Sequence, residues 1–213
     1  MTQAHAERKD FNKEAAQWDA NAFRVNLAND VSAAMIREVR PTKDMTVLDF
    51  GCGTGLVTLA LQPLVKSIVG ADSSTGMLAT LDAKIAAQKL TNVRTQHVDF
   101  ENGQHVAGGY DLIVSSMVAH HVPDTLGLFR EWHGLLLPGG QVCFADLDTE
   151  DGAFHGDNTG VFHMGFDRQH LRALLAEAGF TGIRDSTATV VRKEIDGQGP
   201  REFPIFLICA RRG

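Results

Sequence analysis

Glycines gather between two apolar segments, in the run DFGCGTG that extends from Asp49 to Gly55. Gly51, Gly53 and Gly55 allow the backbone to approach a ligand closely, because glycine has no side chain and adopts left-handed conformations. A helix predicted to begin near Leu56 points free N–H groups and the positive end of its dipole toward the same place. The run therefore predicts a loop that binds a nucleotide-like ligand.

An acid lies at or next to the end of each of the first two predicted strands. Asp49 stands two residues before the first glycine, where a carboxylate can accept a hydrogen bond from a ligand ammonium. Asp72 lies 21 residues after Gly51, where a carboxylate can accept both hydroxyls of a ribose. A dinucleotide-binding fingerprint requires glycine three residues after its second glycine, but position 56 is Leu. The spacing G-x-G-x-G thus favours a ligand other than a dinucleotide.

Histidines supply the other candidate chemistry. His120 and His121 follow the fourth predicted strand, and histidine is the side chain best suited to accept a proton near neutral pH. His121 is therefore the first candidate for a general base and His120 the second, although either could equally be a pocket-wall residue satisfied by the backbone. The remaining candidates, His155, His163 and His170, lack the spacing of metal ligands, so we expect no metal site.

The elements that position these groups follow from the alternation of apolar runs with helical patterns, which predicts a parallel sheet with right-handed crossovers. The predicted strands cover residues 46–50, 67–72, 93–98, 111–115 and 141–147. The predicted helices cover residues 56–64, 77–90, 125–137 and 168–178, with Asp167 as the N-cap of the last.

The two ends of the chain differ from this alternation. Residues 11–39 have the three- and four-residue apolar spacing of amphipathic helices. Residues 183–191 and 203–210 flank a turn-rich joint at 196–200 that is too short for a crossover helix, so they should form an antiparallel hairpin. We therefore expect an α/β doubly wound, seven-stranded, mostly parallel Rossmann-like sheet with an antiparallel C-terminal hairpin and helices on both faces.

Length and composition restrict the number of domains, the partners and the location that we expect for this chain. A chain of 213 residues with 44% hydrophobic residues suits one structural domain, with helices in 1–40 that cap the ligand site of a main unit in 41–213. The net charge of −6 comes without a basic run, which disfavours a nucleic-acid partner. No apolar run is long enough to span a membrane, so we expect a cytoplasmic monomer or homodimer. The 3 widely spaced cysteines predict free thiols.

Taken in order, these motifs resemble those of the class I S-adenosylmethionine-dependent methyltransferases, particularly the branch that includes quinone-biosynthesis enzymes. The segments that carry the resemblance are 47–55, the acid at 72, 98–100, 111–116 and the LLPGG run at 136–140. The resemblance covers roughly residues 10 to 212. It implies S-adenosylmethionine as the methyl donor and a Rossmann-like methyltransferase sheet.

The resemblance also implies which residues hold the cofactor: Trp18, Asp49, Gly51, Cys52, Gly53, Gly55, Asp72, Ser73, Met77, Asp99, Phe100, Ser115 and Ser116. In this interpretation Asp49 and the loop backbone hold the methionine moiety, and Asp72 holds the ribose. Asp99 contacts the adenine amino group, and Ser115 and Ser116 lie beside the sulfonium. The resemblance further implies that the segment around Trp18 closes over the cofactor.

The function expected from these residues is methyl transfer to a small-molecule acceptor by in-line displacement, for which alignment in a dry pocket is the main requirement. The segment 148–167 has no clear periodicity, so we expect it to form a loop over the acceptor pocket. Two alternatives stay open. One is an NAD-dependent Rossmann-type dehydrogenase, and the other is a non-catalytic S-adenosylmethionine-binding regulatory protein.

Overall fold

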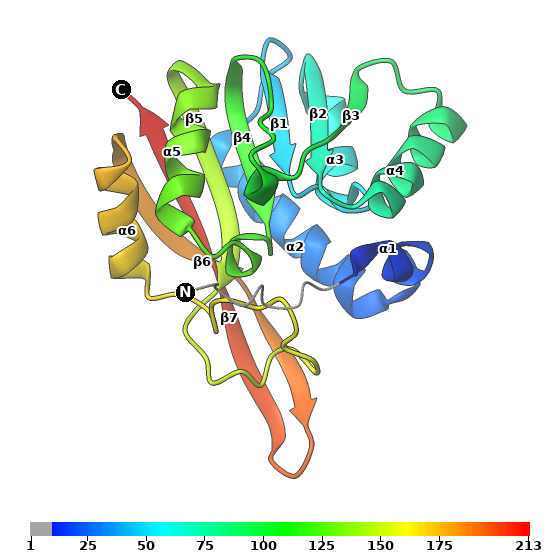
Figure 1. Cartoon of the computed structure of the whole chain (residues 1–213), viewed down its shortest axis with the longest axis vertical. Helices are drawn as coiled ribbons and strands as arrows, with labels where there is room; N and C mark the ends of the chain where they lie inside the picture. Colours follow the sequence, from blue (N-terminus) through cyan, green and yellow to red (C-terminus); the bar gives the residue numbers. More distant parts are fainter. Residues whose placement is uncertain (1–9) are drawn as a thin grey trace.

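A twisted sheet runs through the computed structural model, which describes residues 10–213, in the strand order β3-β2-β1-β4-β5-β7-β6 (Figure 1). The seven strands in that part of the chain are β1 (Thr46–Phe50), β2 (Ser67–Asp72), β3 (Val93–His97), β4 (Tyr110–Ser116), β5 (Leu136–Leu147), β6 (Phe180–Ile195) and β7 (Gly199–Arg212). Strands β1 to β5 pair in parallel, whereas β7 is antiparallel to both β5 and β6.

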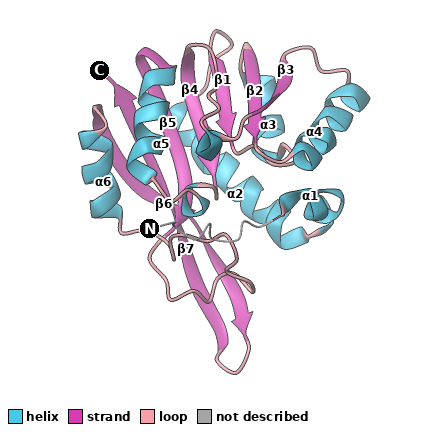
Figure 2. Ribbon diagram, viewed as in Figure 1, coloured by secondary structure: helices cyan, strands magenta, loops and turns pink. Residues whose placement is uncertain are grey.

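Helices cover both faces of this sheet (Figure 2). The α-helices are α1 (Phe11–Glu14), α2 (Ala22–Val39), α3 (Leu56–Leu61), α4 (Thr75–Gln88), α5 (Thr125–Leu135) and α6 (Arg168–Glu177). Short 3₁₀ segments cover Ala15–Ala20 (η1), Gln62–Leu64 (η2), Phe100–Asn102 (η3) and Ala119–His121 (η4). Of the predicted capping segment 1–40, the first nine residues lie outside the described part of the chain.

Alternation along the strands explains the two layers of core. In β1, Val47 packs in the cluster that contains α2 and α3 side chains, whereas its neighbour Leu48 packs in the cluster that contains α5 and α6. Because both faces of β1 and β2 are covered, these strands read as continuous apolar runs, which is why the sequence located their ends. The predicted fold class is confirmed.

The last three strands are longer than the sequence predicted. Strand β6 extends from Phe180 to Ile195, well beyond the predicted 183–191. It is an edge strand with mostly exposed or half-buried side chains, so its apolar signal is weak, although its backbone pairs with β7 from end to end apart from two register shifts. The β6–β7 hairpin projects beyond the body of the sheet beside the segment 148–167 (Figure 1).

Side-chain caps fix where the helices begin. Asn21, Ser74, Asp124 and Asp167 each accept a backbone hydrogen bond at the start of α2, α4, α5 and α6, respectively. Such caps satisfy donors that would otherwise be unpaired. The predicted N-cap role of Asp167 is therefore confirmed.

All three cysteines are free and buried. Two of them that are distant in sequence, Cys143 and Cys209, are direct register partners on β5 and β7. The sequence could not predict this contact, because the two cysteines are far apart along the chain and only the pairing of β5 with β7 brings them together.

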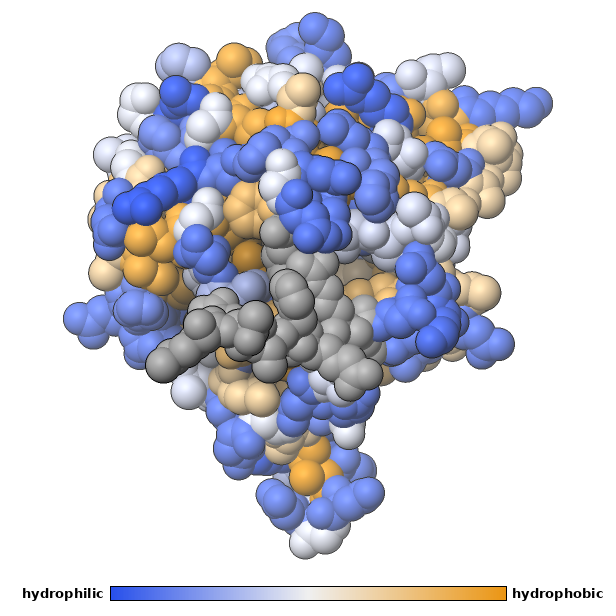
Figure 3. Space-filling model, viewed as in Figure 1, coloured by the Kyte–Doolittle hydropathy of each residue, from blue (hydrophilic) through white to orange (hydrophobic). Residues whose placement is uncertain are grey.

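The surface shown in Figure 3 is largely hydrophilic, with hydrophobic residues in small separate groups. Among the described residues, the exposed large hydrophobic side chains are Leu137, Phe162, Met164 and Val190. Within residues 10–213, none of the helices combines the length and the apolar character needed to cross a membrane.

Candidate active site

A cavity of about 730 Å³ opens at the carboxyl edge of the parallel strands. Its walls come from the ends of β1, β2 and β4, the N-terminal helical segment, the segment 148–167 and residues 192–194 of β6, next to the turn of the β6–β7 hairpin. Such an edge is where open α/β sheets bind ligands. We call the part around Asp49, Gly51, Gly53 and Asp72 the glycine-loop end, and the part around 120–121 and 155–160 the histidine end.

The glycines shape the loop for reasons that differ from one position to the next. Gly51 has φ +72°, and a Cβ placed there would lie 2.3 Å from a methyl carbon of Val118. Gly53 has φ +53° and lines the cavity with open space beside it. Gly55 also has positive φ but faces Leu81 instead of the cavity, so its function is close packing where α3 begins.

Asp72 braces the glycine loop from the end of β2. Its Oδ2 accepts the Gly53 N–H at 2.8 Å, and its Oδ1 accepts the Ser74 N–H at 2.8 Å. Burial raises the pKa of Asp72, although these backbone donors oppose the shift. Each carboxylate oxygen keeps a lone pair for a further donor, so the side chain can hold the loop and a ligand hydroxyl together.

Asp49 is a buried carboxyl group at the end of β1. The Thr58 hydroxyl on α3 donates to its Oδ2 at 2.5 Å. Burial raises the pKa of Asp49 to about 7, and the nearby Asp72 charge adds to the shift, whereas the Thr58 hydrogen bond opposes it. A cation at this end of the cavity would favour the ionised form of both acids.

The N-terminal segment is fastened to the glycine loop by polar contacts that the sequence did not reveal. Asp19 accepts from the Thr54 hydroxyl at 2.6 Å and pairs with Lys84 at 2.5 Å. Lys84 also donates to the Thr54 carbonyl at 2.7 Å. Asn12 accepts from the Gly76 N–H at the start of α4 at 2.8 Å. The segment thus forms one wall of the glycine-loop end.

Most of the residues that the sequence singled out line this cavity. They are Trp18, Asp49, Gly51, Cys52, Gly53, Asp72, Ser73, Met77, Asp99, Phe100, Ser116, His120 and His121. Ser115 and Gly55 do not line it. Ser115 alternates with Ser116 along β4, so its side chain points into the core and donates to the Phe50 carbonyl at 2.8 Å. Cys52 is buried, and burial raises its pKa, which keeps its thiol neutral.

The histidine end contains a buried pair that the sequence only half predicted. His120 Nδ1 lies 2.7 Å from Oδ1 of Asp146 on β5, with the two side chains 1% and 0% exposed. Burial opposes ionisation of Asp146, but the His120 ring and the His120 and Leu147 N–H donors outweigh it and lower its pKa. Asp146 was missed because a single acid within an apolar strand run carries no motif.

Two further histidines stand beside this pair. The ring centroids of His120 and His121 are 4.1 Å apart, and those of His120 and His155 are 4.9 Å apart. His121 Nδ1 lies 2.7 Å from the Gly160 carbonyl, which accepts its proton, and Phe11 packs edge-on against the same ring at 5.2 Å. Within residues 10–213, no group of three His, Cys, Asp or Glu side chains is arranged to hold a metal ion.

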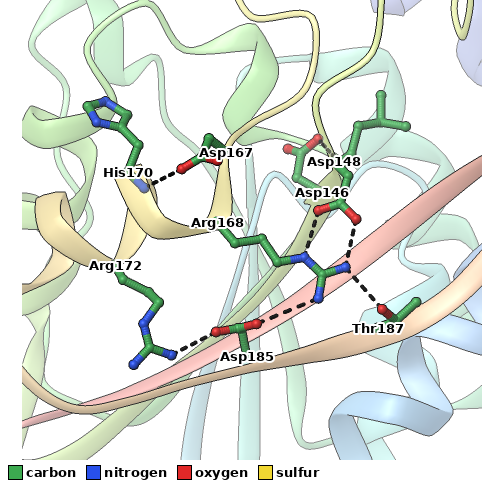
Figure 4. A network of polar contacts seen from close by, with 9 residues as sticks. Asp146, Asp148, Asp167, Arg168, His170, Arg172, Asp185 and Thr187 are labelled. Atoms are coloured by element: carbon green, nitrogen blue, oxygen red, sulfur yellow. Dashed lines mark hydrogen bonds and ion pairs between the residues drawn. The ribbon is translucent and has the colours of Figure 1, made fainter.

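The segment 148–167 covers the histidine end, and polar contacts hold the two ends of this segment together. Figure 4 shows Arg168 at the start of α6 reaching back to Asp148, with Nε–Oδ1 and Nη2–Oδ2 distances of 2.7 Å. The same guanidinium donates to Thr187 and pairs with Asp185, both on β6. At its middle, the segment donates the Phe162 N–H to the His120 carbonyl at 2.9 Å. As predicted, the segment forms a loop that lines the cavity.

Comparisons with known proteins agree with this geometry. Residues 47–140 match the model of a methyltransferase domain family. An uncharacterized methyltransferase of Schizosaccharomyces pombe is 28% identical over 74% of this chain and 61% of its own length. A ubiquinone biosynthesis O-methyltransferase of Ruegeria pomeroyi is 35% identical over 49% of this chain and 42% of its own length. The chain therefore spans less than two thirds of these relatives.

Among solved structures, the complex of DhpI with SAH is similar over 99% of both chains, with a TM-score of 0.73 and 18% sequence identity. At that identity the likeness establishes the fold alone.

Proposed function

We propose that this chain, whose residues 47–140 match a methyltransferase domain family, is a class I S-adenosylmethionine-dependent methyltransferase that transfers a methyl group from S-adenosylmethionine to a small-molecule acceptor. The donor occupies the glycine-loop end of the cavity, and the acceptor occupies the histidine end. The observation that carries the proposal is that one cavity joins Asp49 and Asp72 to the histidine cluster.

The residues at the glycine-loop end fit the donor. A buried carboxyl group at Asp49 suits the ammonium of the methionine moiety, because an ion pair there offsets the burial of the charge. Asp72 has lone pairs for the ribose hydroxyls, and the open space beside Gly53 leaves room for close approach. Met77 and Phe100 supply apolar walls for the adenine, with Asp99 beside them.

When bound, S-adenosylmethionine supplies an electrophilic methyl group on a sulfonium. The protein's contribution is to align the acceptor with that methyl group and to exclude water. Trp18, under the Arg24 guanidinium at 3.7 Å, and the loop 148–167 wall the cavity on two sides. A small acceptor fits these walls, since the cavity has the size of an ordinary small-molecule site.

Calorimetric titration with S-adenosylmethionine and with NAD tests the donor. We expect binding of S-adenosylmethionine and of its product S-adenosylhomocysteine, and no binding of NAD. Tight NAD binding without S-adenosylmethionine binding would favour a dehydrogenase and overturn the proposal. Formation of S-adenosylhomocysteine with a screened panel of acceptors separates an enzyme from a non-catalytic cofactor-binding protein.

A further inference from the structure

His120 and Asp146 form a buried hydrogen-bonded pair at the histidine end of the cavity. Neither the glycine loop nor the packing of the sheet explains this pair. A carboxylate accepts and does not donate, so the 2.7 Å contact places a proton on Nδ1 of His120, and in the neutral ring Nε2 then carries a lone pair. Among the described residues, Nε2 has no hydrogen-bond partner although it is buried. His120 is among the residues that line the cavity, and its Nε2 is shielded from solvent in the ligand-free protein, so an acceptor bound there meets this lone pair only when the neighbouring side chains move aside.

An unpartnered buried nitrogen is unfavourable for folding, and native structures rarely retain one without a reason. A histidine whose Nδ1–H is held by a buried carboxylate is oriented for proton transfer at Nε2, and the carboxylate stabilises the imidazolium that results. Asp146 is itself fixed by N–H donors from His120 and Leu147. The pair is therefore preorganised before any acceptor binds.

The walls near this pair are aromatic. Phe11, Phe23, Phe154 and Phe162 line the cavity around the histidines, and Phe23 and Phe154 contact each other with ring centroids 6.2 Å apart. Aromatic walls favour a flat, apolar ligand body. The titratable groups that face His120 from packed elements are Asp146 on β5, His121 beside it and His155 on the loop.

We propose that His120 is the general base of the reaction, that Asp146 is its positioning residue, and that the acceptor is a flat hydroxylated compound such as a phenol. This inference rests on the proposed function. The O–H bond of the acceptor breaks, its proton forms the N–H bond at Nε2 of His120, and the electron pair stays on oxygen. That oxygen takes the methyl group, and the electron pair of the broken C–S bond stays on sulfur. The proton on His120 then passes to solvent.

The test uses the protein saturated with S-adenosylhomocysteine and 4-nitrophenol as the probe, because its phenolate absorbs at longer wavelength than its phenol. At a pH one unit below the pKa of the free probe, the bound probe should show the phenolate spectrum, with its acid dissociation constant raised at least tenfold. His120→Gln should abolish this shift, and Asp146→Asn should reduce it about tenfold or more. His170→Gln, an exposed substitution on α6 outside the cavity, should leave it unchanged.

Absence of probe binding, a bound probe that stays a phenol, or a shift that survives His120→Gln each overturns the inference. Failure of the wild-type protein to bind S-adenosylhomocysteine in calorimetry would instead overturn the proposed function. Bound S-adenosylhomocysteine also verifies that each buried variant is folded. Should a variant fail that check, ¹⁵N spectra of wild-type histidine rings decide: one ring must become doubly protonated when the probe binds, and no such change contradicts the proposal.

Discussion

The glycine-loop end of the cavity comes mainly from residues 49–58 and the end of β2, whereas the histidine end combines η4, β5 and the loop 148–167. In the first, Asp49 and Thr58 are nine residues apart. In the second, the hydrogen bond between His120 and Asp146 spans 26 residues, and that between His121 and Gly160 spans 39. The first end is thus built on a local motif to which Asp19 adds one distant contact, whereas the second is assembled from distant segments throughout.

This difference has a chemical counterpart. The glycine-loop end offers two carboxyl groups and backbone N–H groups, which suit the cationic, hydroxylated donor that we propose. The histidine end offers imidazole rings and aromatic walls, which suit proton transfer from a flat acceptor. Substitutions at one end should therefore change donor affinity and leave acceptor binding intact, and the reverse should hold at the other.

The largest effect expected at the glycine-loop end comes from Asp49→Asn. At pH 8, removal of the buried charge should weaken S-adenosylmethionine binding on the order of 100-fold, as a charge-assisted hydrogen bond to the ammonium is lost. The same change should raise the free energy of unfolding of the ligand-free protein by roughly 2–4 kcal/mol, because the wild-type carboxylate is ionised there against its burial. Calorimetry and denaturant unfolding measure the two. A variant that is less stable with unchanged affinity would show that Asp49 serves packing only.

A smaller loss is expected from Asp72→Ala, since the ribose contact is closer to solvent. Donor affinity should fall by about 1–3 kcal/mol. Part of this loss should come from the Gly53 and Ser74 N–H groups, which lose the carboxylate that accepts them in the wild-type protein. Asp72→Asn is the matched control, which keeps the shape and one acceptor oxygen and should lose less. Equal affinity of all three proteins in calorimetry would count against a ribose contact.

The pH dependence of donor binding should single out Asp49. Its pKa of about 7 in the free protein lies above its unfolded value of 3.8, so a proton must leave when the ammonium binds below pH 7. The dissociation constant should rise about tenfold per pH unit below pH 7 and level off above it. Likewise, the free protein should lose stability as pH rises from about 4 to about 7. In Asp49→Asn both dependences should shrink, and an unaltered profile would assign them to another group.

The smallest effect should come from Arg168→Lys at the base of the loop 148–167. Lysine cannot reproduce the bidentate hydrogen bonding of Arg168 with Asp148, so the free energy of unfolding should fall by about 1 kcal/mol. The KM for the acceptor should rise a few-fold. Donor affinity should not change. Arg172→Lys on the same helix, whose exposed guanidinium contacts Asp185, is the matched control and should alter neither quantity. A loss of donor affinity in Arg168→Lys would break the proposed separation of the two ends.

Much of the fold could be predicted from the sequence, because the signals that set the strand and helix bounds lie within short segments of the chain. The bounds of β1 and β2 follow from continuous apolar runs with an acid in the last or second-to-last position, and the α6 start follows from the cap at Asp167. The extra length of β6 could not be predicted, since an exposed edge strand has little apolar pattern and depends on its pairing with β7.

The sequence by itself determined the glycine loop, because the glycines, the acid and the helix start that form it are close together along the chain. It also singled out His120 and His121, but it favoured His121 and contained no sign of the Asp146 contact. Only the tertiary structure decided that Asp146 holds His120, that Ser115 faces the core and Ser116 the cavity, and that Asp19 fastens the N-terminal segment. The physical reason is that these contacts depend on strand register and loop packing, which bring together residues distant along the chain.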